Sequence, residues 1–380
     1  MNKIKVMTVF GTRPEAIKMA PLIKELEKRS EIESIVCVTA QHRQMLDQVL
    51  NTFKIKPDFD LNIMKPGQTL SQITCNVLNG IDNVIKEVKP DIVLVHGDTT
   101  TAFASALSAF YSQVNIGHVE AGLRTFNKYS PYPEEMNRQM IDRMADMFFA
   151  PTNFTKNNLL DEGVSEDKIY VTGNTVIDAM KTTVNKDYSN EILDWVGNDR
   201  MILLTAHRRE NLGEPMYNIF KAIRRIVDEF DDVKVVYPIH LNPKVREIAN
   251  DVLNGCDKVK LIEPLEVFDF HNFQNKSYII LSDSGGIQEE APSLGKPVLV
   301  LRDTTERPEG IDAGTLKLAG TNEENIYQLT KQLLIDKNAY SKMSKATNPY
   351  GDGHASKYIA DAIIKKLKKT IWSDKEKVDN

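Results

Sequence analysis

The sequence is poor in the residues that stabilise small secreted domains. Its 380 residues include only three cysteines, Cys37, Cys75 and Cys256, which lie far apart and are odd in number. They form neither a disulfide framework nor a CxxC metal site, which favours a reducing compartment. No apolar run approaches the roughly 20 residues of a membrane span, and the early segment IKVMTVF reads as a strand and not as a signal peptide. We therefore expect a soluble, cytoplasmic protein with no membrane partner.

A net positive charge and the common nucleotide motifs are also lacking. The net charge of −5 argues against a nucleic-acid binder. No GxGxxG occurs, and the nearest approach to a P-loop has Glu290 in place of its first glycine and Pro297 in place of its Ser/Thr. Nicotinamide and ATP are therefore poorly supported as ligands. The composition, 41% hydrophobic and 27% charged, is typical of a globular protein, and the length allows two domains.

Short apolar runs alternate with helical patterns along the chain. This alternation predicts an α/β protein with parallel sheets and right-handed crossovers. A polar interval at 185–200 separates two such series, so we predict two α/β domains of similar type at 1–172 and 173–355, then a closing C-terminal helix and tail at 356–380. The runs expected to be strands are 4–10, 35–39, 92–95, 114–119, 148–150, 201–205, 233–238, 259–262, 278–281 and 297–301.

The stretch 279–310 carries the clearest ligand signal. A Ser-Gly-Gly turn at 284–286 breaks a buried strand and opens a helix. Such a turn presents unpaired backbone N–H groups and the positive end of a helix dipole, which together favour a phosphate. Glu290 could accept hydrogen bonds from a ribose, and Arg302 and Arg307 could approach the same anion. The alternative is an ordinary βα turn with a small-residue cap.

Polar residues cluster just after the predicted strands, where ligands of open parallel sheets bind. If the two carboxyl edges face each other, these residues line one interdomain cleft. The set is Arg13, Gln41, His96, Asp98, His118, Glu120, His207, Arg208, Arg209, His240, Ser284 and Arg307.

Carboxylates are prominent in this set. Asp98 and Glu120 end consecutive strands, and Glu134 and Glu135 open the next helix. Several acids converging on one place favour general acid/base catalysis, which needs a proton acceptor and a donor. A helix cap or a partner for the helix dipole is the alternative for each of them, above all for Glu134 and Glu135.

Two histidine-containing motifs allow another interpretation. His96 with Asp98, and His118 with Glu120, resemble metal ligands, but their spacing matches no metal motif with a known mechanism. Such histidines more often orient a carboxylate. The loop at 207–209 joins an imidazole to two arginines and suits a diphosphate, with a solvated charged turn as the alternative.

Longer motifs give a resemblance to a known family. The chain is similar, over nearly its whole length, to the non-hydrolysing UDP-N-acetylglucosamine 2-epimerases. The segments that carry the likeness, in the right order, are GTRPEAIKMAP (11–21), HGDTTTA (96–102), HVEAGLRT (118–125), PEEMNRQMID (133–142), VTGNTVIDA (171–179), HRREN (207–211) and SDSGGIQEEAPSLGKPVLVLRDTTERPEG (282–310).

This resemblance implies a fold and a reaction. The implied fold is of the GT-B type, two Rossmann-like domains facing an interdomain cleft, usually as a homodimer. The implied reaction interconverts UDP-GlcNAc and UDP-ManNAc for bacterial cell-surface polymers, by elimination of UDP and re-addition through a 2-acetamidoglucal. No cofactor or metal is required.

The resemblance also implies roles for individual residues, with acid/base groups in the first domain and UDP binding in the second. The implied catalytic residues are Asp98, Glu120, Glu134 and His207; which acid serves which face of C2 stays open. The implied substrate-binding residues are Arg13, Lys18, Phe270, Ser284, Gly285, Gly286, Glu290 and Arg307.

Bacterial members of the family are often activated by UDP-GlcNAc bound beside the active site. One departure is visible here, because Gly67 stands where a basic residue is expected, which weakens the prediction of substrate activation. The matching activator positions are Gln41, Gln44, Glu134, Arg208 and His240.

Three other functions compete with this interpretation. A GT-B glycosyltransferase would bind the nucleotide similarly but would need an acceptor. A hydrolysing epimerase would release free ManNAc and UDP. A UDP-sugar sensor would bind without turnover, although the density of acids at the strand ends argues against it.

Overall fold

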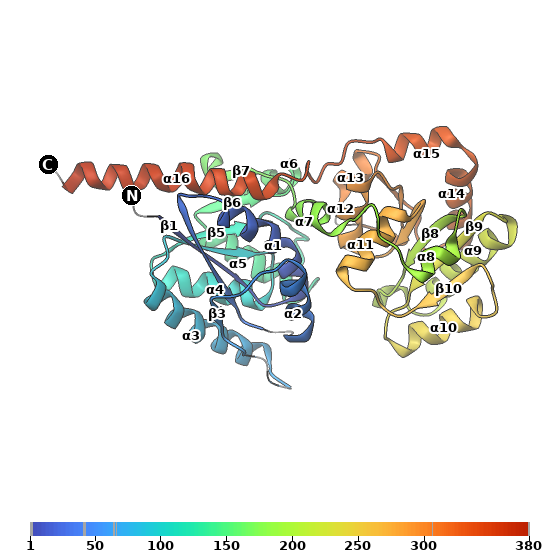
Figure 1. The fold of residues 1–380 in the computed structure, drawn as a ribbon, viewed down its shortest axis with the longest axis horizontal. Coiled ribbons are helices and arrows are strands. Elements are labelled where there is room, and N and C mark those ends of the chain that lie inside the picture. Colours follow the sequence, from blue (N-terminus) through green and yellow to red (C-terminus); the bar gives the residue numbers. More distant parts are fainter. Residues whose placement is uncertain (1–2, 41–42, 64, 66, 306, 379–380) are drawn as a thin grey trace. The chain divides into compact units, whose positions relative to one another are not determined.

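The structure is a computed structural model that describes residues 3–40, 43–63, 65, 67–305 and 307–378, with the side chains of 43–45 and 369–378 left out of the description. The chain forms two compact units, shown in Figure 1. Unit 1 comprises Met1–Ala179 and Tyr350–Asn380, and unit 2 comprises Met180–Pro349. The predicted α/β class is confirmed in both units.

Unit 1 is built on a seven-stranded sheet in the order β3-β2-β1-β4-β5-β6-β7, with every pairing parallel. All five residues of β4 are buried, as expected for a strand covered on both faces. Its strands are β1 (Ile4–Phe10), β2 (Ile32–Val38), β3 (Phe59–Asp60), β4 (Ile92–His96), β5 (Asn115–Val119), β6 (Met147–Ala150) and β7 (Ile169–Val171).

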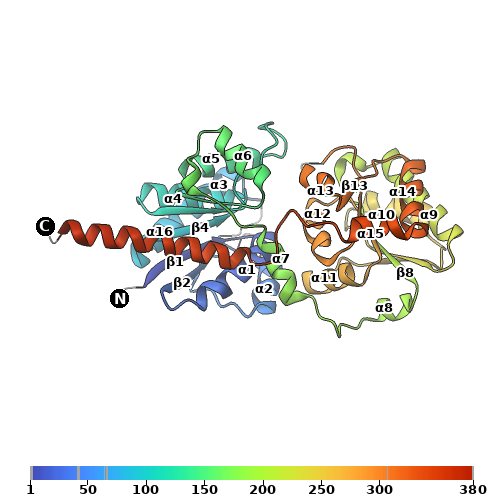
Figure 2. The same cartoon turned by 90° about the horizontal axis from the view of Figure 1, so that it is seen from above.

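Helices cover both faces of this sheet. On one face α3, α4 and α5 lie side by side, and on the other α1 lies between α2 and α16 (Figure 2). The helices of unit 1 are α1 (Arg13–Glu27), α2 (Arg43–Thr52), α3 (Leu70–Val88), α4 (Thr100–Tyr111), α5 (Glu134–Met144), α6 (Asn153–Asp161), the 3-10 turn η1 (Glu166–Lys168), α7 (Thr175–Thr183), whose end lies in unit 2, and α16 (Ala355–Val378).

Unit 2 repeats this plan on a six-stranded parallel sheet in the order β10-β9-β8-β11-β12-β13. Its strands are β8 (Arg200–Thr205), β9 (Val233–Pro238), β10 (Val259–Ile262), β11 (Ile279–Ser282), β12 (Val298–Val300) and β13 (Leu316–Leu318). Its helices are α8 (Glu191–Val196), η2 (Arg209–Asn211), α9 (Glu214–Glu229), α10 (Pro243–Leu253), α11 (Val267–Lys276), α12 (Gly285–Glu290), η3 (Ala291–Leu294), α13 (Pro308–Asp312), α14 (Glu323–Ile335) and α15 (Lys337–Ser344).

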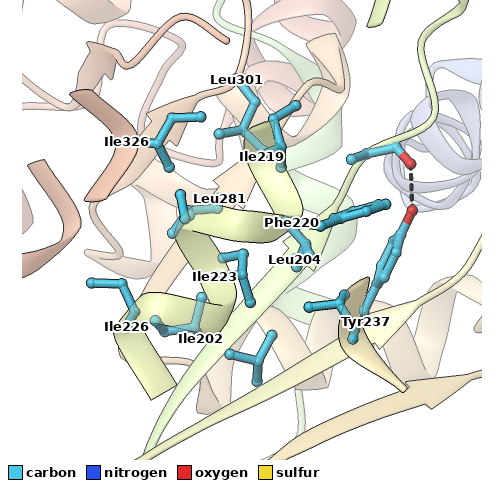
Figure 3. Close-up of a cluster of buried hydrophobic side chains, with 14 of the residues drawn as sticks. Ile202, Leu204, Ile219, Phe220, Ile223, Ile226, Tyr237, Leu281, Leu301 and Ile326 are labelled. Carbon is cyan, nitrogen blue, oxygen red and sulfur yellow. Dashed lines mark hydrogen bonds between the residues drawn. The ribbon is translucent and has the colours of Figure 1, made fainter. Parts of the chain in front are cut away.

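Alternating residues of β8 divide the core of unit 2 between the two faces of the sheet. Ile202 and Leu204 pack with α9, α10 and α14, whereas Met201 and Leu203 pack with α8, α11 and α12. Figure 3 shows the first of these clusters. Within it the Tyr237 hydroxyl donates to the Ala206 carbonyl at 2.5 Å, which anchors the chain just after β8.

The C-terminal helix α16 packs on unit 1, as its amphipathic pattern predicts. Ile359, Ile363 and Leu367 are buried, and the helix lies beside α1 in both views (Figures 1 and 2). An ion pair joins Asp361 of α16 to Arg29, which follows the end of α1.

The chain crosses between the two units twice. The sequence predicts divisions after 172 and 355, and the contacts divide the chain after Ala179 and before Tyr350. The difference arises because Val176, Ile177 and Tyr350 form one buried cluster with Ile17 of α1. The segments next to both crossings therefore pack with unit 1.

Candidate active site

Each sheet reverses its strand order at one place. The reversal lies between β1 and β4 in unit 1, and between β8 and β11 in unit 2. In open parallel sheets, ligands bind beyond the carboxyl ends of the strands at such a reversal. Arg13 and Asp98 follow β1 and β4, while His207 and Ser284 follow β8 and β11. These four predicted site residues therefore fall at the switch points of the two sheets.

Glu120 follows β5 with a left-handed backbone, φ 68°. Its Oε1 forms an ion pair with the Lys18 ammonium and accepts a hydrogen bond from Asn174 Nδ2 at 2.9 Å. Its Oε2 lies 3.7 Å from His96 Nε2. Donors to a carboxylate favour its charged form, so the two contacts of Oε1 favour the Glu120 anion.

Asp98 sits beside Glu120 in a different environment. Its Oδ2 lies 3.2 Å from Arg138 Nη2, and its carbonyl accepts from Asn137 Nδ2 at 2.9 Å. Burial raises the pKa of Asp98 to about 6, an effect that Arg138 opposes and that Glu120 and Glu134 reinforce. Asp98 is therefore poised to gain or lose a proton near neutral pH.

The buried imidazole of His96 completes this group. Burial lowers its pKa to about 4, partly opposed by the negative charge of Glu120, so the ring is neutral at pH 7. Its Nε2 is a buried atom without a hydrogen-bond partner among the described residues. Unsatisfied buried polar atoms are rare in native proteins and often mark a functional site.

The two adjacent acids at the start of α5 differ in their surroundings. Glu135 is fully buried and accepts the amides of Thr125 and Phe126, each at 3.0 Å. Burial opposes its ionisation, but the bonds from Thr125 and Gln139 outweigh burial and lower its pKa. Glu134 instead has a buried Oε2 with no hydrogen-bond partner in the described part of the chain. Glu135 is therefore structural, whereas Glu134 stays a predicted catalytic residue.

His118 links the Gly97 carbonyl, in the turn after β4, to the buried Asp142. Its Nε2 lies 2.8 Å from the Gly97 carbonyl, which can only accept, so Nε2 donates. Its Nδ1 lies 2.5 Å from Asp142 Oδ1, and Asp142 Oδ2 accepts from Arg124 at 2.7 Å. Burial raises the pKa of Asp142, but His118 and Arg124 outweigh burial and lower it. His118 thus orients the turn that carries Asp98.

Both ring nitrogens of His118 are engaged, which removes it from the alternative metal set. Among the residues that the structure describes, no three His, Cys, Asp or Glu side chains are grouped to hold a metal ion.

In the first βα turn of unit 1, the side chain of Glu15 binds the backbone amides of the turn. The amides of Gly11 and Thr12 donate to Glu15 Oε2 at 3.1 and 2.8 Å, and burial raises the pKa of Glu15. These amides are therefore not available to a phosphate. Arg13, the first residue of α1, has a half-buried side chain.

In unit 2, Asp283 organises the loop after β8. Its Oδ2 accepts from the amides of His207 and Arg208 at 2.7 and 2.8 Å, and its Oδ1 lies 3.3 Å from His207 Nδ1. Burial lowers the pKa of His207, opposed by Asp283. Because Asp283 takes the amides, this loop can offer a diphosphate its side chains but not its first two N–H groups.

The predicted phosphate turn contacts an arginine directly. A Cβ on Gly285 would lie 2.6 Å from Arg307 Nη1, so the guanidinium packs against the glycine that opens α12. Arg307 Nε donates to Glu289 Oε1 at 2.7 Å, which fixes the guanidinium there. A cation and the start of a helix thus meet at one point, an arrangement that favours an anion.

Glu290 and Phe270 lie on the same side of the unit 2 sheet, on α12 and α11. Glu290 Oε2 accepts from Gln274 at 2.7 Å and lies 3.8 Å from His271 Nε2. Phe270 is partly buried against the core that contains Ile287. The carboxylate of Glu290 is therefore oriented before any ligand binds.

The activator positions are only partly described. The His240 ring stacks on His207 at 5.3 Å between centroids and 9° between planes. Arg208 Nε donates to the Asp283 carbonyl at 3.3 Å. Gln41 lies outside the described residues, as does the side chain of Gln44.

The profile of the UDP-N-acetylglucosamine 2-epimerase family matches residues 24–364. The chain belongs to this family. It is 70% identical over 364 residues to UDP-N-acetylglucosamine 2-epimerase of Bacillus subtilis, and the aligned residues cover 96% of each chain.

Two solved structures extend the likeness to the fold. The S. aureus MnaA–UDP structure is 58% identical, covers 96% of this chain and 97% of its own, and superposes with a TM-score of 0.89. The UDP-GlcNAc 2-epimerase of Neisseria meningitidis bound to UDP-GlcNAc is 54% identical, covers 95% and 100%, and has a TM-score of 0.86. The predicted family and its GT-B-type fold are confirmed.

Within this 2-epimerase family fold, the structure brings several predicted residues together. Asp98, Glu120 and Lys18 form one connected group in unit 1. Gly285 and Arg307 form another in unit 2. Their roles in binding and catalysis stay predictions.

Sequence reasoning missed three residues that hold these groups in place. Asn174 contacts Glu120, Arg138 contacts Asp98, and Asp283 holds the His207 loop. Asn174 lies in the quoted motif at 171–179, but β7, which precedes it, was not among the predicted strands.

No described helix is both long and apolar enough to span a bilayer.

Proposed function

We propose that this protein reversibly interconverts UDP-N-acetylglucosamine and UDP-N-acetylmannosamine. Membership of the 2-epimerase family and the Neisseria relative solved with UDP-GlcNAc support this substrate. The observation that carries the proposal is the set of three acids at the carboxyl edge of unit 1, Asp98, Glu120 and Glu134, whose surroundings differ.

The chemistry explains why both acids and a phosphate site are needed. C2 of the sugar is not adjacent to a carbonyl, so loss of its proton must be assisted by departure of UDP from C1. A base takes the C2 proton, the C–H electron pair forms the C1=C2 double bond, and the C1–O pair leaves with UDP. Protonation of the 2-acetamidoglucal on the opposite face, with return of UDP to C1, gives the epimer.

The acids of unit 1 supply the proton transfers in this proposal. Two faces of C2 require groups in different protonation states. Glu120, whose Oε1 pairs with the Lys18 ammonium, suits the acceptor role. Asp98, with a pKa raised to about 6, can act in either direction near neutral pH. Glu134 contributes a third carboxyl with a buried oxygen that lacks a partner among the described residues.

The residues of unit 2 stabilise the leaving UDP in this proposal. Charge develops on the diphosphate as the C1–O bond breaks, and fixed donors aimed at it lower the barrier. The substrate of this proposal is a single UDP-sugar. The residues proposed to bind it are Arg13, Lys18, Phe270, Ser284, Gly285, Gly286, Glu290 and Arg307, with His207 as the fourth catalytic residue.

We propose substrate activation as a secondary property. UDP-GlcNAc would act at Gln41, Gln44, Glu134, Arg208 and His240. The stacking of His240 on His207 gives such a ligand a direct route to a catalytic residue. Gly67, in place of a basic residue, predicts weak activation. We also propose a homodimer whose product supplies cell-surface polymers.

An assay with purified protein and UDP-GlcNAc alone tests the function. We expect UDP-ManNAc to accumulate to an equilibrium mixture without added acceptor, as followed by NMR. Free ManNAc and UDP in equal amounts would identify a hydrolysing epimerase. Turnover only with an acceptor would identify a glycosyltransferase, and binding without product a sensor.

A matched pair of variants links this activity to the proposed acids. Glu120→Gln keeps the shape of the side chain and removes the proton acceptor, so we expect turnover to fall by at least about 100-fold. Glu87→Gln makes the same change at an exposed position of α3 and should leave turnover unchanged. Equal activity in both variants would remove Glu120 from the mechanism.

A further inference from the structure

Asn174 occupies an unusual place at the start of α7. It is buried, with 3% of its surface exposed, and it follows the end of β7 closely. Its Oδ1 accepts the Val176 amide at 3.0 Å, in the manner of a helix cap. Because an amide N–H must donate, this contact fixes the orientation of the side chain. Its Nδ2 therefore points at Glu120 Oε1, 2.9 Å away.

The backbone of this segment is fixed independently. The Asn174 amide donates to the Tyr350 carbonyl at 2.7 Å. The preceding Gly173 has φ 84°, and a Cβ there would lie 3.0 Å from Gly351 Cα and from the Tyr350 oxygen. Two stretches of chain thus cross at van der Waals distance through glycine. Because this crossing anchors the backbone of Asn174, the position of its Nδ2 atom beside Glu120 is fixed as well.

Glu120 is surrounded by ionisable groups from several elements. Lys18 approaches from α1 and His96 from β4, while Asp98 follows β4 and His118 precedes Glu120 on β5. Lys18 is the cation that pairs with Glu120 Oε1, and Asn174 adds a neutral donor to the same oxygen. The acids of α5, Glu134 first, act on the neighbouring Asp98.

We propose that Asn174 is a positioning residue that holds the Glu120 carboxylate ionised and correctly oriented for proton transfer at C2. This inference rests on the proposed epimerase function. The two hydrogen bonds of the Asn174 side chain can be separated chemically. Capping α7 needs only an acceptor, and Asp or Ser caps a helix about as well as Asn. The donor on Asn174 is needed by Glu120 and not by the helix.

Two variants separate the donor from the cap. Asn174→Asp is isosteric and keeps the acceptor for Val176, but it replaces the donor with a negative charge. Asn174→Ser keeps a capping oxygen on a side chain too short to reach Glu120. We expect kcat for UDP-GlcNAc epimerisation to fall roughly 10- to 100-fold in both, with KM changed less, since a hydrogen bond to a charged group is lost.

The pH profile distinguishes positioning from a structural effect. A like charge beside Glu120 favours its protonated form, so the acidic limb of the activity profile should move to higher pH in Asn174→Asp. The move should be smaller but in the same direction in Asn174→Ser. Asn322→Asp, which changes an exposed cap of α14 that accepts the Asn325 amide, is the matched control and should match the wild type.

The outcomes are distinct. Wild-type protein that does not epimerise UDP-GlcNAc would remove the proposed function itself. If the wild type turns over, variants that keep its kcat and pH profile overturn the role of Asn174. A loss of activity that follows only the loss of folded protein, with an unmoved pH profile, overturns it as well. Should Asn174→Asp not fold, Asn174→Ser decides the question by the same two measurements.

Discussion

The environment of Asp98 predicts that this side chain lowers the stability of the fold at neutral pH. Burial is the main cause of its raised pKa, and the nearby carboxylates add to it. A pKa raised from 3.8 to about 6 corresponds to roughly 3 kcal/mol of unfavourable free energy for the ionised form. Because 27% of the side chain is exposed to water, this value is an upper bound. Asp98→Asn removes the charge and should stabilise the protein.

The effect should depend on pH in a defined direction. The folded-state pKa lies above that of the unfolded chain, so the folded protein binds this proton more tightly. The stability that the proton contributes is fully present below pH 3.8 and is lost as the pH rises to about 6. We therefore expect Asp98→Asn to exceed the wild type by up to about 3 kcal/mol at pH 7.5, and by about half of that at pH 5.

Urea unfolding of the wild type and the variant at both pH values measures this difference. Asp161→Asn, the same change at the exposed end of α6, should give a difference near zero at both. Asp98→Asn should also lose epimerase activity, as expected where stability is sacrificed for function. An Asp98→Asn protein that is less stable than the wild type at pH 7.5 would refute the reasoning, since it would mean that the pair with Arg138 outweighs burial.

Two further substitutions test the supports of the site. Gly285→Ala places a methyl group against Arg307 and should displace it from Glu289, lowering the affinity for UDP about 10-fold in calorimetry while the thermal unfolding temperature changes little; an unchanged affinity contradicts this. His118→Phe should lower the free energy of unfolding by about 3 kcal/mol because it leaves Asp142 buried beside an apolar ring, and adding Asp142→Asn should recover part of that loss. A loss within about 0.5 kcal/mol, as for surface changes, would show that the buried pair is not stabilising.

The central strands of both sheets were predictable from the sequence. β1, β4, β8 and β11 are mostly buried, so their residues form largely apolar runs that stand out from the surrounding helices. The strands that were missed are short and lie toward the sheet edges. β3 has two residues, and β13 has two exposed residues out of three, so neither leaves a clear apolar pattern.

The site was predictable only in outline. Polar residues that follow strands could be found because the carboxyl ends of parallel strands meet at one edge. Which of two neighbouring acids is structural could not be predicted, since Glu135 differs from Glu134 through tertiary contacts such as those with the Thr125 and Phe126 amides. Likewise, Asn174 reaches Glu120 across 54 residues, and no local pattern records that pairing.

The fate of the C2 hydrogen tests the central claim most directly. Protein incubated with UDP-GlcNAc in heavy water should form UDP-ManNAc that carries deuterium at C2, as detected by NMR and mass spectrometry. The label follows from removal of the C2 proton by a carboxylate and its return from an acid that exchanges with solvent. Epimer that keeps its original C2 hydrogen would contradict the elimination and re-addition mechanism.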